Sequence, residues 1–248
     1  MKKHIIQLLS LFTKDKQKTL LEQNFSFSQE YLKAIEMCKN AKNLADIGCG
    51  ATPDKNAKYA FDLSIAPIFH RGSGLAIDVK EIEKNGTKFI EAPCENLPVK
   101  DKFFDVSITK HMIEHVDDPI KACKEIMRVS KEGIIICPSM FAEYIFTRPY
   151  HKWFVTYRGN TLIFIEKTND FGLPFGQCPQ NVVDDSSNPF DILLNYENWY
   201  NGNEKMPRLS NILRKYWFSH DKVIENVFIW KDSFNVIVID KDGKIKTN

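Results

Sequence analysis

The fold is decided by one short stretch, Leu44-Ala-Asp-Ile-Gly-Cys-Gly50, in which a strand runs directly into two glycines. Glycines here let the backbone turn tightly and approach a ligand closely. A dinucleotide-binding loop has a third glycine, which opens a helix that holds a pyrophosphate. This loop instead continues as Ala51-Thr-Pro-Asp54. A ligand without phosphates therefore suits it better, although a plain strand-to-helix turn is the simpler alternative.

The pattern that follows indicates alternating strands and helices. We expect further strands at residues 59–62, 87–90, 104–108 and 133–137. A helix is predicted over Pro119–Val129, because its apolar residues fall on one face. Strands separated by helices or crossovers indicate a parallel sheet with both faces covered. The sequence thus predicts an α/β fold, with a Rossmann-like, mostly parallel sheet and flanking helices.

Three regions are expected along the chain. Residues 1–42 form N-terminal helices, the second of which begins at an N-cap, Ser28. Residues 43–140 form the Rossmann-like core. Residues 141–248 form an elaboration with a loop-like stretch at 169–189, and strand character returns at 234–239. We expect that last segment to complete the sheet.

Two acidic residues are candidates for holding a ribose. Asp62 ends the strand after the glycine loop, where a carboxylate can accept both hydroxyls of a nucleoside. Asp78 competes with it, but Asp62 is preferred because its strand follows the loop directly. Asp46, beside the glycines, suits a ligand with an ammonium group. These positions predict a nucleoside-binding site without choosing between cofactors.

Several stretches resemble class I S-adenosylmethionine-dependent methyltransferases, of the small-molecule type found in ubiquinone biosynthesis. They are residues 44–50, 92–98, 103–108 and 111–119, so the resemblance covers roughly residues 42–140. It implies S-adenosylmethionine as cofactor. The cofactor-binding residues that it implies are Asp46, Gly48, Cys49, Gly50, Asp62, Leu63, Cys94, Glu95, Thr109 and Lys110.

The resemblance also implies what these residues do. The glycines lie under the methionine part, Asp46 orders the loop near the amino group, and Asp62 takes the ribose hydroxyls. Cys94 and Glu95 lie at the adenine edge. The family often has an acid at the position of Pro93. Since proline cannot replace that acid, the adenine must be held by shape and backbone groups.

The catalytic candidates are His111, Tyr150 and His151. The resemblance implies that His111, after the fourth strand, faces the acceptor, and the ordinary histidine pKa of about 6.5 suits a general base near neutrality. Tyr150 and His151, with Trp153, are candidates for the acceptor pocket, although an aromatic stripe is more often core. Arg148 and Arg158 are candidates for an anionic group on the acceptor, with simple surface placement equally open.

The segment from His111 to His115 also reads H-x-x-E-H, an inverted zinc-peptidase motif. That motif needs a long helix, whereas His111 follows a strand directly. Some ubiquinone-type methyltransferases bind a divalent metal at this place with an acid, a Glu and a His, so a site of His111, Glu114 and His115 stays open. A structural hydrogen bond for Glu114 and His115 is favoured, and no metal is assigned.

Composition and charge indicate which classes of binding partner to expect. Net charge is +2, from 34 basic against 32 acidic residues, so nucleic-acid binding is not expected. The Asn/Asp-Pro-Pro-aromatic signature of nucleic-acid methyltransferases is absent after the fourth strand. None of the 6 cysteines forms a CxxC pair, and no apolar run is long enough to span a bilayer. We expect a cytoplasmic protein with a small-molecule acceptor and no membrane partner, in an undetermined oligomeric state.

The predicted reaction is O-methylation of a small polar acceptor, such as a sugar, a sugar-like compound or a phosphorylated metabolite. N-methylation of a small amine is a close second. Two other classes stay open: a nicotinamide-dependent oxidoreductase, which the missing third glycine disfavours, and a non-catalytic nucleoside-binding domain.

Overall fold

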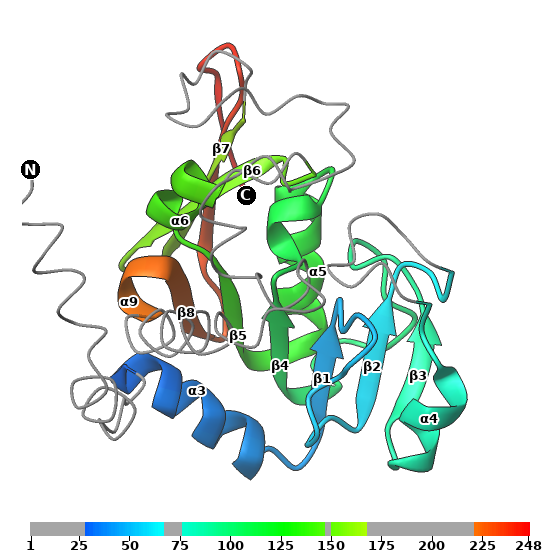
Figure 1. Cartoon of the computed structure of the whole chain (residues 1–248). Helices are drawn as coiled ribbons and strands as arrows, with labels where there is room; N and C mark the ends of the chain where they lie inside the picture. The colour runs from blue at the N-terminus through cyan, green and yellow to red at the C-terminus, as the bar shows by residue number, and fades with distance from the viewer. Residues whose placement is uncertain (1–27, 67–75, 147–149, 168–220) are drawn as a thin grey trace, which may run out of the picture.

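The computed structural model describes residues 28–66, 76–146, 150–167 and 221–248 (Figure 1). The predicted loop at 169–189, Arg148 and most of the N-terminal region lie outside these residues. In the described part of the chain, no helix has the length and apolar character needed to span a bilayer.

The described residues form a central six-stranded sheet in the order β3-β2-β1-β4-β5-β8. Strands β1 to β5 pair in parallel, and β8 is antiparallel to β5. The strands are β1 (Leu44–Ile47), β2 (Tyr59–Asp62), β3 (Lys88–Glu91), β4 (Phe104–Lys110), β5 (Ser130–Pro138) and β8 (Glu225–Lys231). The prediction of a Rossmann-like, mostly parallel sheet is confirmed.

Helices cover both faces of this sheet. They are α3 (Gln29–Asn40), α4 (Val79–Lys84), α5 (Pro119–Val129), α6 (Met140–Phe146), α9 (Asp221–Ile224) and the 3-10 turn η1 (Ile113–His115). Helix α3 begins where predicted, because the Ser28 hydroxyl accepts the Tyr31 N–H at 3.2 Å. Helix α5 also has its predicted bounds, with Asp118 as N-cap before Pro119.

Alternate residues of β5 face the two sides of the sheet. Ile134 and Ile136 share a buried cluster with Ala34 and Cys38 of α3. Ile135 and Cys137 belong to the larger core that also holds the buried face of α5. This alternation is the period of two that a strand imposes, and it explains why β5 is apolar along its whole centre.

A second sheet packs on the α5 side of the molecule, in the order β10-β9-β7-β6. Its strands are β6 (Trp153–Arg158), β7 (Thr161–Glu166), β9 (Asn235–Ile239) and β10 (Ile245–Thr247). Figure 1 shows β6 and β7 above the carboxyl ends of β4 and β5. The apolar residues of this sheet belong to the same core as α5.

The prediction that residues 234–239 complete the central sheet is wrong. In the described residues, the strand that follows β5 at the edge of that sheet is β8, while β9 pairs in parallel with β7 in the second sheet. Asp232, between β8 and β9, has a φ of 61°, which turns the chain out of the first sheet. Both segments are apolar strands, and strand character alone does not assign a strand to a sheet.

Candidate functional site

The site lies where the strand order of the central sheet reverses. Strands β1 and β4 are neighbours. The strand after β1 is added toward one edge of the sheet, and the strand after β4 is added toward the other edge. In open α/β sheets, ligands bind outside the carboxyl ends of the strands at such a point. The loop after β1 begins at Gly48, and the segment after β4 begins at His111. Both sequence-predicted regions therefore meet at this place.

Gly48 is required by its backbone and by its neighbour. Its φ is +77°, a conformation that L side chains rarely adopt. A Cβ placed on it would lie 2.2 Å from Cγ of Met112. The glycine loop therefore packs directly against the segment after β4, which brings the predicted cofactor and acceptor regions into contact.

Asp62 lies beside this loop at the end of β2. Its Oδ2 accepts the N–H of Gly50 at 2.8 Å, and the residue is 8% exposed. Its competitor Asp78 is the N-cap of α4, where Oδ1 accepts the Glu81 N–H. The carboxylate next to the loop is thus that of Asp62, while that of Asp78 has a structural role.

Asp46 orders the same loop directly. Its Oδ2 accepts the Asp54 N–H at 2.7 Å, while Oδ1 is buried without a hydrogen-bond partner among the described residues. Burial raises the pKa of Asp46 to about 7, and the charges of Asp54 and Asp62 add to this. The Asp54 hydrogen bond and Lys110 act in the opposite direction. A cationic ligand group near Oδ1 would favour the ionised form.

The other predicted cofactor residues surround this loop in different ways. Leu63, after Asp62, is 61% exposed, so its apolar side chain is accessible to the purine base of a nucleoside. The Cys49 thiol is buried and donates to the Gly50 carbonyl at 3.3 Å. The Cys94 thiol donates to Oε2 of Glu95 at 3.2 Å, in the loop after β3.

The two predicted residues at the end of β4 point to different surroundings. Thr109 is fully buried, and its hydroxyl has no hydrogen-bond partner among the described residues. Lys110 reaches α3 instead, where Nζ donates to the Tyr31 hydroxyl at 3.1 Å. Desolvation lowers the pKa of Lys110, but Tyr31 and the nearby acids raise it overall. Thr109 therefore offers a buried hydroxyl, whereas the amine of Lys110 already donates to Tyr31.

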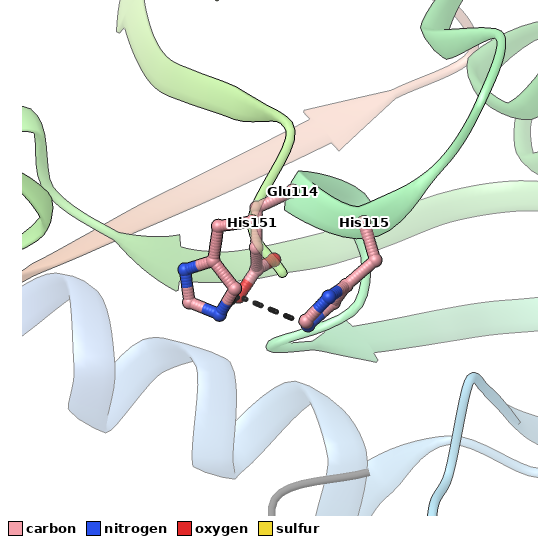
Figure 2. Close-up of side chains that lie close together, drawn as sticks. All are labelled: Glu114, His115 and His151. Carbon is pink, nitrogen blue, oxygen red and sulfur yellow. Dashed lines mark ion pairs between the residues drawn. The ribbon is translucent and has the colours of Figure 1, made fainter. Parts of the chain in front are cut away.

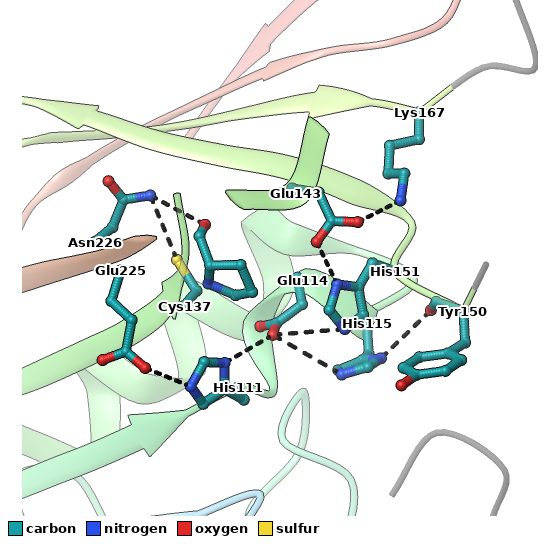
Figure 3. A network of polar contacts seen from close by, with 11 residues as sticks. His111, Glu114, His115, Cys137, Glu143, Tyr150, His151, Lys167, Glu225 and Asn226 are labelled. Atoms are coloured by element: carbon teal, nitrogen blue, oxygen red, sulfur yellow. Dashed lines mark hydrogen bonds and ion pairs between the residues drawn. The ribbon is translucent and has the colours of Figure 1, made fainter. Parts of the chain in front are cut away.

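His111 begins the polar segment after β4 and has a left-handed backbone, with φ 49°. Its N–H still donates to the Ile136 carbonyl, so pairing with β5 continues to this residue. Its Nε2 lies 3.0 Å from Oε1 of Glu225, and its Nδ1 lies 3.6 Å from Oε1 of Glu114. The ring is therefore held between two carboxylates (Figure 3).

This surrounding changes the expected protonation of His111. Desolvation lowers its pKa, but the nearby carboxylates of Glu114 and Glu225 outweigh it and raise the pKa to about 9. The expectation of an ordinary value near neutrality is therefore wrong. Its proposed role as a base requires loss of a proton that two carboxylates retain.

Glu114 is the centre of a histidine cluster. The residue is 1% exposed on η1, and its Oε1 lies 4.0 Å from Nε2 of His115 and 3.9 Å from Nε2 of His151. Burial raises its pKa, but His111 and the other two histidines lower it to about 2. Figure 2 shows the two rings on either side of the carboxylate.

The structure brings His151 to this cluster by backbone contacts. The Lys152 N–H donates to the Glu114 carbonyl at 2.9 Å, and the buried Trp153 indole donates to the Val116 carbonyl at 2.7 Å. Tyr150 stacks on His115, with ring centroids 5.7 Å apart. The three aromatic residues of this stretch therefore divide: Trp153 is core, whereas Tyr150 and His151 join the polar cluster.

Sequence reasoning missed Glu143, Lys167 and Glu225. Glu143 of α6 is 3% exposed and accepts from Nδ1 of His151 at 2.6 Å, and Lys167 donates to its other oxygen. Burial raises the pKa of Glu143, but His151 and Lys167 lower it overall. None of these three residues belongs to a recognisable motif. The one sequence signal is for Glu143, which is the single charged residue of an otherwise apolar helix.

The comparison with known families bears on the core of this site. Residues 45–137 match the sequence profile of a family described as methyltransferase domain. The match begins in β1, ends in β5 and includes the glycine loop, Asp62 and the segment after β4. This segment is a class I S-adenosylmethionine-dependent methyltransferase domain. The predicted family and its cofactor are thereby confirmed for this part of the chain.

Solved structures similar to the methyltransferase domain are distant. A possible histamine N-methyltransferase from Thermotoga maritima is 24% identical, with a TM-score of 0.32 over 53% of this chain and 60% of that chain. Geranyl diphosphate C-methyltransferase from Streptomyces coelicolor is 12% identical, with a TM-score of 0.35 over 56% of each chain. We draw no conclusion on activity from them, and this chain spans less than two thirds of either. A search of curated proteins finds no match.

Proposed function

We propose that the chain transfers the methyl group of S-adenosylmethionine to a small polar acceptor. An oxygen of a sugar, a sugar-like compound or a phosphorylated metabolite is the first candidate. The observation that carries the proposal is the glycine loop of the methyltransferase domain. It packs on Met112 and has the buried Asp62 carboxylate beside it.

The residues around the loop fit the cofactor. Asp62 would accept the ribose hydroxyls, and the exposed Leu63 would cover the base. Asp46, whose Oδ1 is buried without a hydrogen bond among the described residues, would hold the ammonium group. When bound, the cofactor supplies an activated methyl group whose sulfur leaves as a neutral thioether. The protein then has to align the acceptor and exclude water.

The acceptor side is supported by the segment after β4. The His111 side chain is 41% exposed. It follows the carboxyl end of β4, beside the carboxyl end of β1 where the glycine loop begins. In its protonated form it donates to an anionic group of the acceptor, and after losing the proton it accepts one from an acceptor hydroxyl. Oxygen as the methylated atom is consistent with both states.

A small amine is the second candidate acceptor. Glu114 and Glu225 lie at 3.6 Å and 3.0 Å from the His111 ring, and both are largely buried. Carboxylates in this position attract an ammonium group as they attract the protonated ring. Product analysis with matched sugars and amines would separate the two candidates.

The first test is binding of S-adenosylhomocysteine, the demethylated product, by titration calorimetry. We expect Asp62→Ala to weaken binding about 10- to 100-fold, because hydrogen bonds to a charged partner contribute about 1.5–3 kcal/mol. Asp78→Ala is the matched control. It removes the N-cap of α4 and should lower stability by about 1 kcal/mol, with unchanged affinity for the product.

Three results would count against the proposal. Equal binding by wild type and Asp62→Ala would remove Asp62 from the site. Binding of a nicotinamide cofactor in place of S-adenosylhomocysteine would move the chain to the oxidoreductases, and binding without turnover on any acceptor would favour a non-catalytic nucleoside-binding domain.

A further inference from the structure

A buried carboxylate lies between two imidazole rings, at the junction of the methyltransferase domain and the second sheet. Neither Oε1 nor Oε2 of Glu114 has a hydrogen-bond partner among the residues that the structure describes. The nearest ring nitrogen is Nδ1 of His111, 3.6 Å from Oε1, and those of His115 and His151 are 4.0 Å and 3.9 Å away, so all three lie beyond hydrogen-bond range. A fully buried carboxylate without hydrogen bonds is costly unless a cation compensates it.

Hydrogen bonds hold both imidazole rings by the opposite nitrogen. Nδ1 of His115 lies 3.3 Å from the Tyr150 carbonyl, and Nδ1 of His151 lies 2.6 Å from Oε2 of Glu143. Both acceptors fix the proton on Nδ1 and leave a lone pair on Nε2. Histidines that bind a metal are held in this way, with the other N–H donated to a carboxylate or a backbone carbonyl. Lys167 in turn holds the second oxygen of Glu143 (Figure 3).

The three candidate donor atoms converge. One ligand atom from each of Glu114, His115 and His151 lies within 4.8 Å of the others (Figure 2). Metal–ligand bonds of about 2.0–2.1 Å in a tetrahedron place donors about 3.3 Å apart. Contractions of roughly 0.5–1.5 Å from the observed separations would complete the site. Rotation of the rings about their Nδ1 hydrogen bonds is a small movement of this kind.

We propose that Glu114, His115 and His151 bind a divalent transition-metal ion. Two imidazoles and one carboxylate favour Zn²⁺, or another imidazole-binding ion such as Co²⁺ or Fe²⁺, over the all-oxygen surroundings that Mg²⁺ takes. Three protein ligands leave at least one position for water or an oxygen of a substrate. That an acceptor oxygen takes this position rests on the proposed function, whereas metal binding itself does not.

The proposed ligands differ from His111, Glu114 and His115, the three residues that the sequence motif indicated. His111 was the third candidate there, but its Nε2 lies 3.0 Å from Glu225 and its backbone turns left-handed before η1. His151 comes from beyond α6, and the backbone bond from Lys152 to Glu114 brings it to the site. The third ligand is therefore supplied by the chain outside the family match, which ends at residue 137.

The test uses the metal alone and needs no methylation. The full chain is dialysed against a chelator and titrated with Zn²⁺ by calorimetry, and with Co²⁺ by its visible ligand-field absorption. We expect one ion per chain in the wild type. His151→Ala and Glu114→Gln should weaken binding at least about 100-fold. Glu143→Gln, which leaves all three ligands in place, should weaken it about 10- to 100-fold.

His111→Ala separates the two ligand sets. It removes a ring that lies 3.6 Å from Oε1 of Glu114 but is not a proposed ligand, so it should weaken Zn²⁺ binding much less than His151→Ala does. Folding is checked in each variant by circular dichroism and chemical unfolding, which do not depend on the proposed cofactor. If His151→Ala does not fold, His151→Gln replaces it. The proposal is overturned if the wild type binds no ion, if His151→Ala binds as wild type, or if His111→Ala rather than His151→Ala loses the ion.

Discussion

At the residue scale, two carboxylates organise the glycine loop. Asp46 and Asp62 each accept one backbone N–H of the loop, from Asp54 and Gly50. Both residues are buried, and these hydrogen bonds hold the loop in one conformation. The loop is therefore shaped before a ligand arrives, which lowers the ordering cost of binding.

The stability of the fold should depend on pH through Asp46. Its pKa rises from 3.8 to about 7 because the carboxyl group is buried. An acid with a raised folded-state pKa contributes stability that is fully present below pH 3.8 and is lost as the pH rises through about 7. We expect Asp46→Asn to fall less in stability over this range than the wild type, as measured by urea unfolding at several pH values.

The control for this measurement is Asp78→Asn. Asparagine caps a helix as well as aspartate does, so α4 should keep its N-terminus while Asp46 stays unchanged. Parallel curves for wild type and Asp46→Asn would show that Asp46 does not titrate in this range.

His111 should affect turnover more than binding. If it moves a proton of the acceptor, His111→Ala lowers kcat about 10²- to 10⁴-fold and leaves the affinity for S-adenosylhomocysteine nearly unchanged. Glu225→Gln keeps the ring and removes only the charge next to Nε2, so its effect on kcat should be smaller. Retained turnover in His111→Ala would exclude it as the base.

At the element scale, β5 lies between β4 and β8 in the central sheet. Gly133 lies opposite Ser107 of β4 and Trp230 of β8. A Cβ there would lie 2.7 Å from the carbonyl oxygen of Ser107 and 2.9 Å from Cζ2 of Trp230. Because backbone cannot yield as a side chain can, this glycine fixes the spacing of the sheet.

Gly133→Ala should therefore lower the free energy of unfolding by about 1–3 kcal/mol, the usual cost of overpacking. Gly243→Asn is the control, because nothing lies within 4 Å of its Cβ position and asparagine tolerates its φ of +75°. We expect that variant to stay within about 0.5 kcal/mol of wild type in chemical unfolding. Equal stability of Gly133→Ala and wild type would mean that the strands move apart at little cost.

At the scale of the whole molecule, the two sheets are joined by polar contacts as well as by their common core. Asn226 at the start of β8 donates through Nδ2 to the Pro138 carbonyl at 3.2 Å and to the Val155 carbonyl at 2.8 Å. One acceptor belongs to β5 and the other to β6. This side chain thus connects the methyltransferase domain to the second sheet, close to the Glu114 cluster.

Asn226→Ala should cost about 1–3 kcal/mol, because two partly buried carbonyls lose a donor. In a chain of this size that lowers Tm by about 2–4 °C for each kcal/mol. Asn160→Ala is matched to it, since Nδ2 of Asn160 donates to the Ser233 carbonyl in an exposed place. A Tm change as small in Asn226→Ala as in Asn160→Ala would show that the apolar core alone joins the sheets.

The sequence determined the local features of this protein. The order of strands from 44 to 137, the caps at Ser28 and Asp118, the glycine loop and Asp62 all depend on residues close in the chain, and short-range sterics and hydrogen bonds decide them. The tertiary structure decided which distant segments meet. It placed β9 in a second sheet, set Glu143 and Glu225 against histidines, and brought His151 to Glu114. These contacts depend on packing between segments far apart in sequence, which a local pattern does not encode.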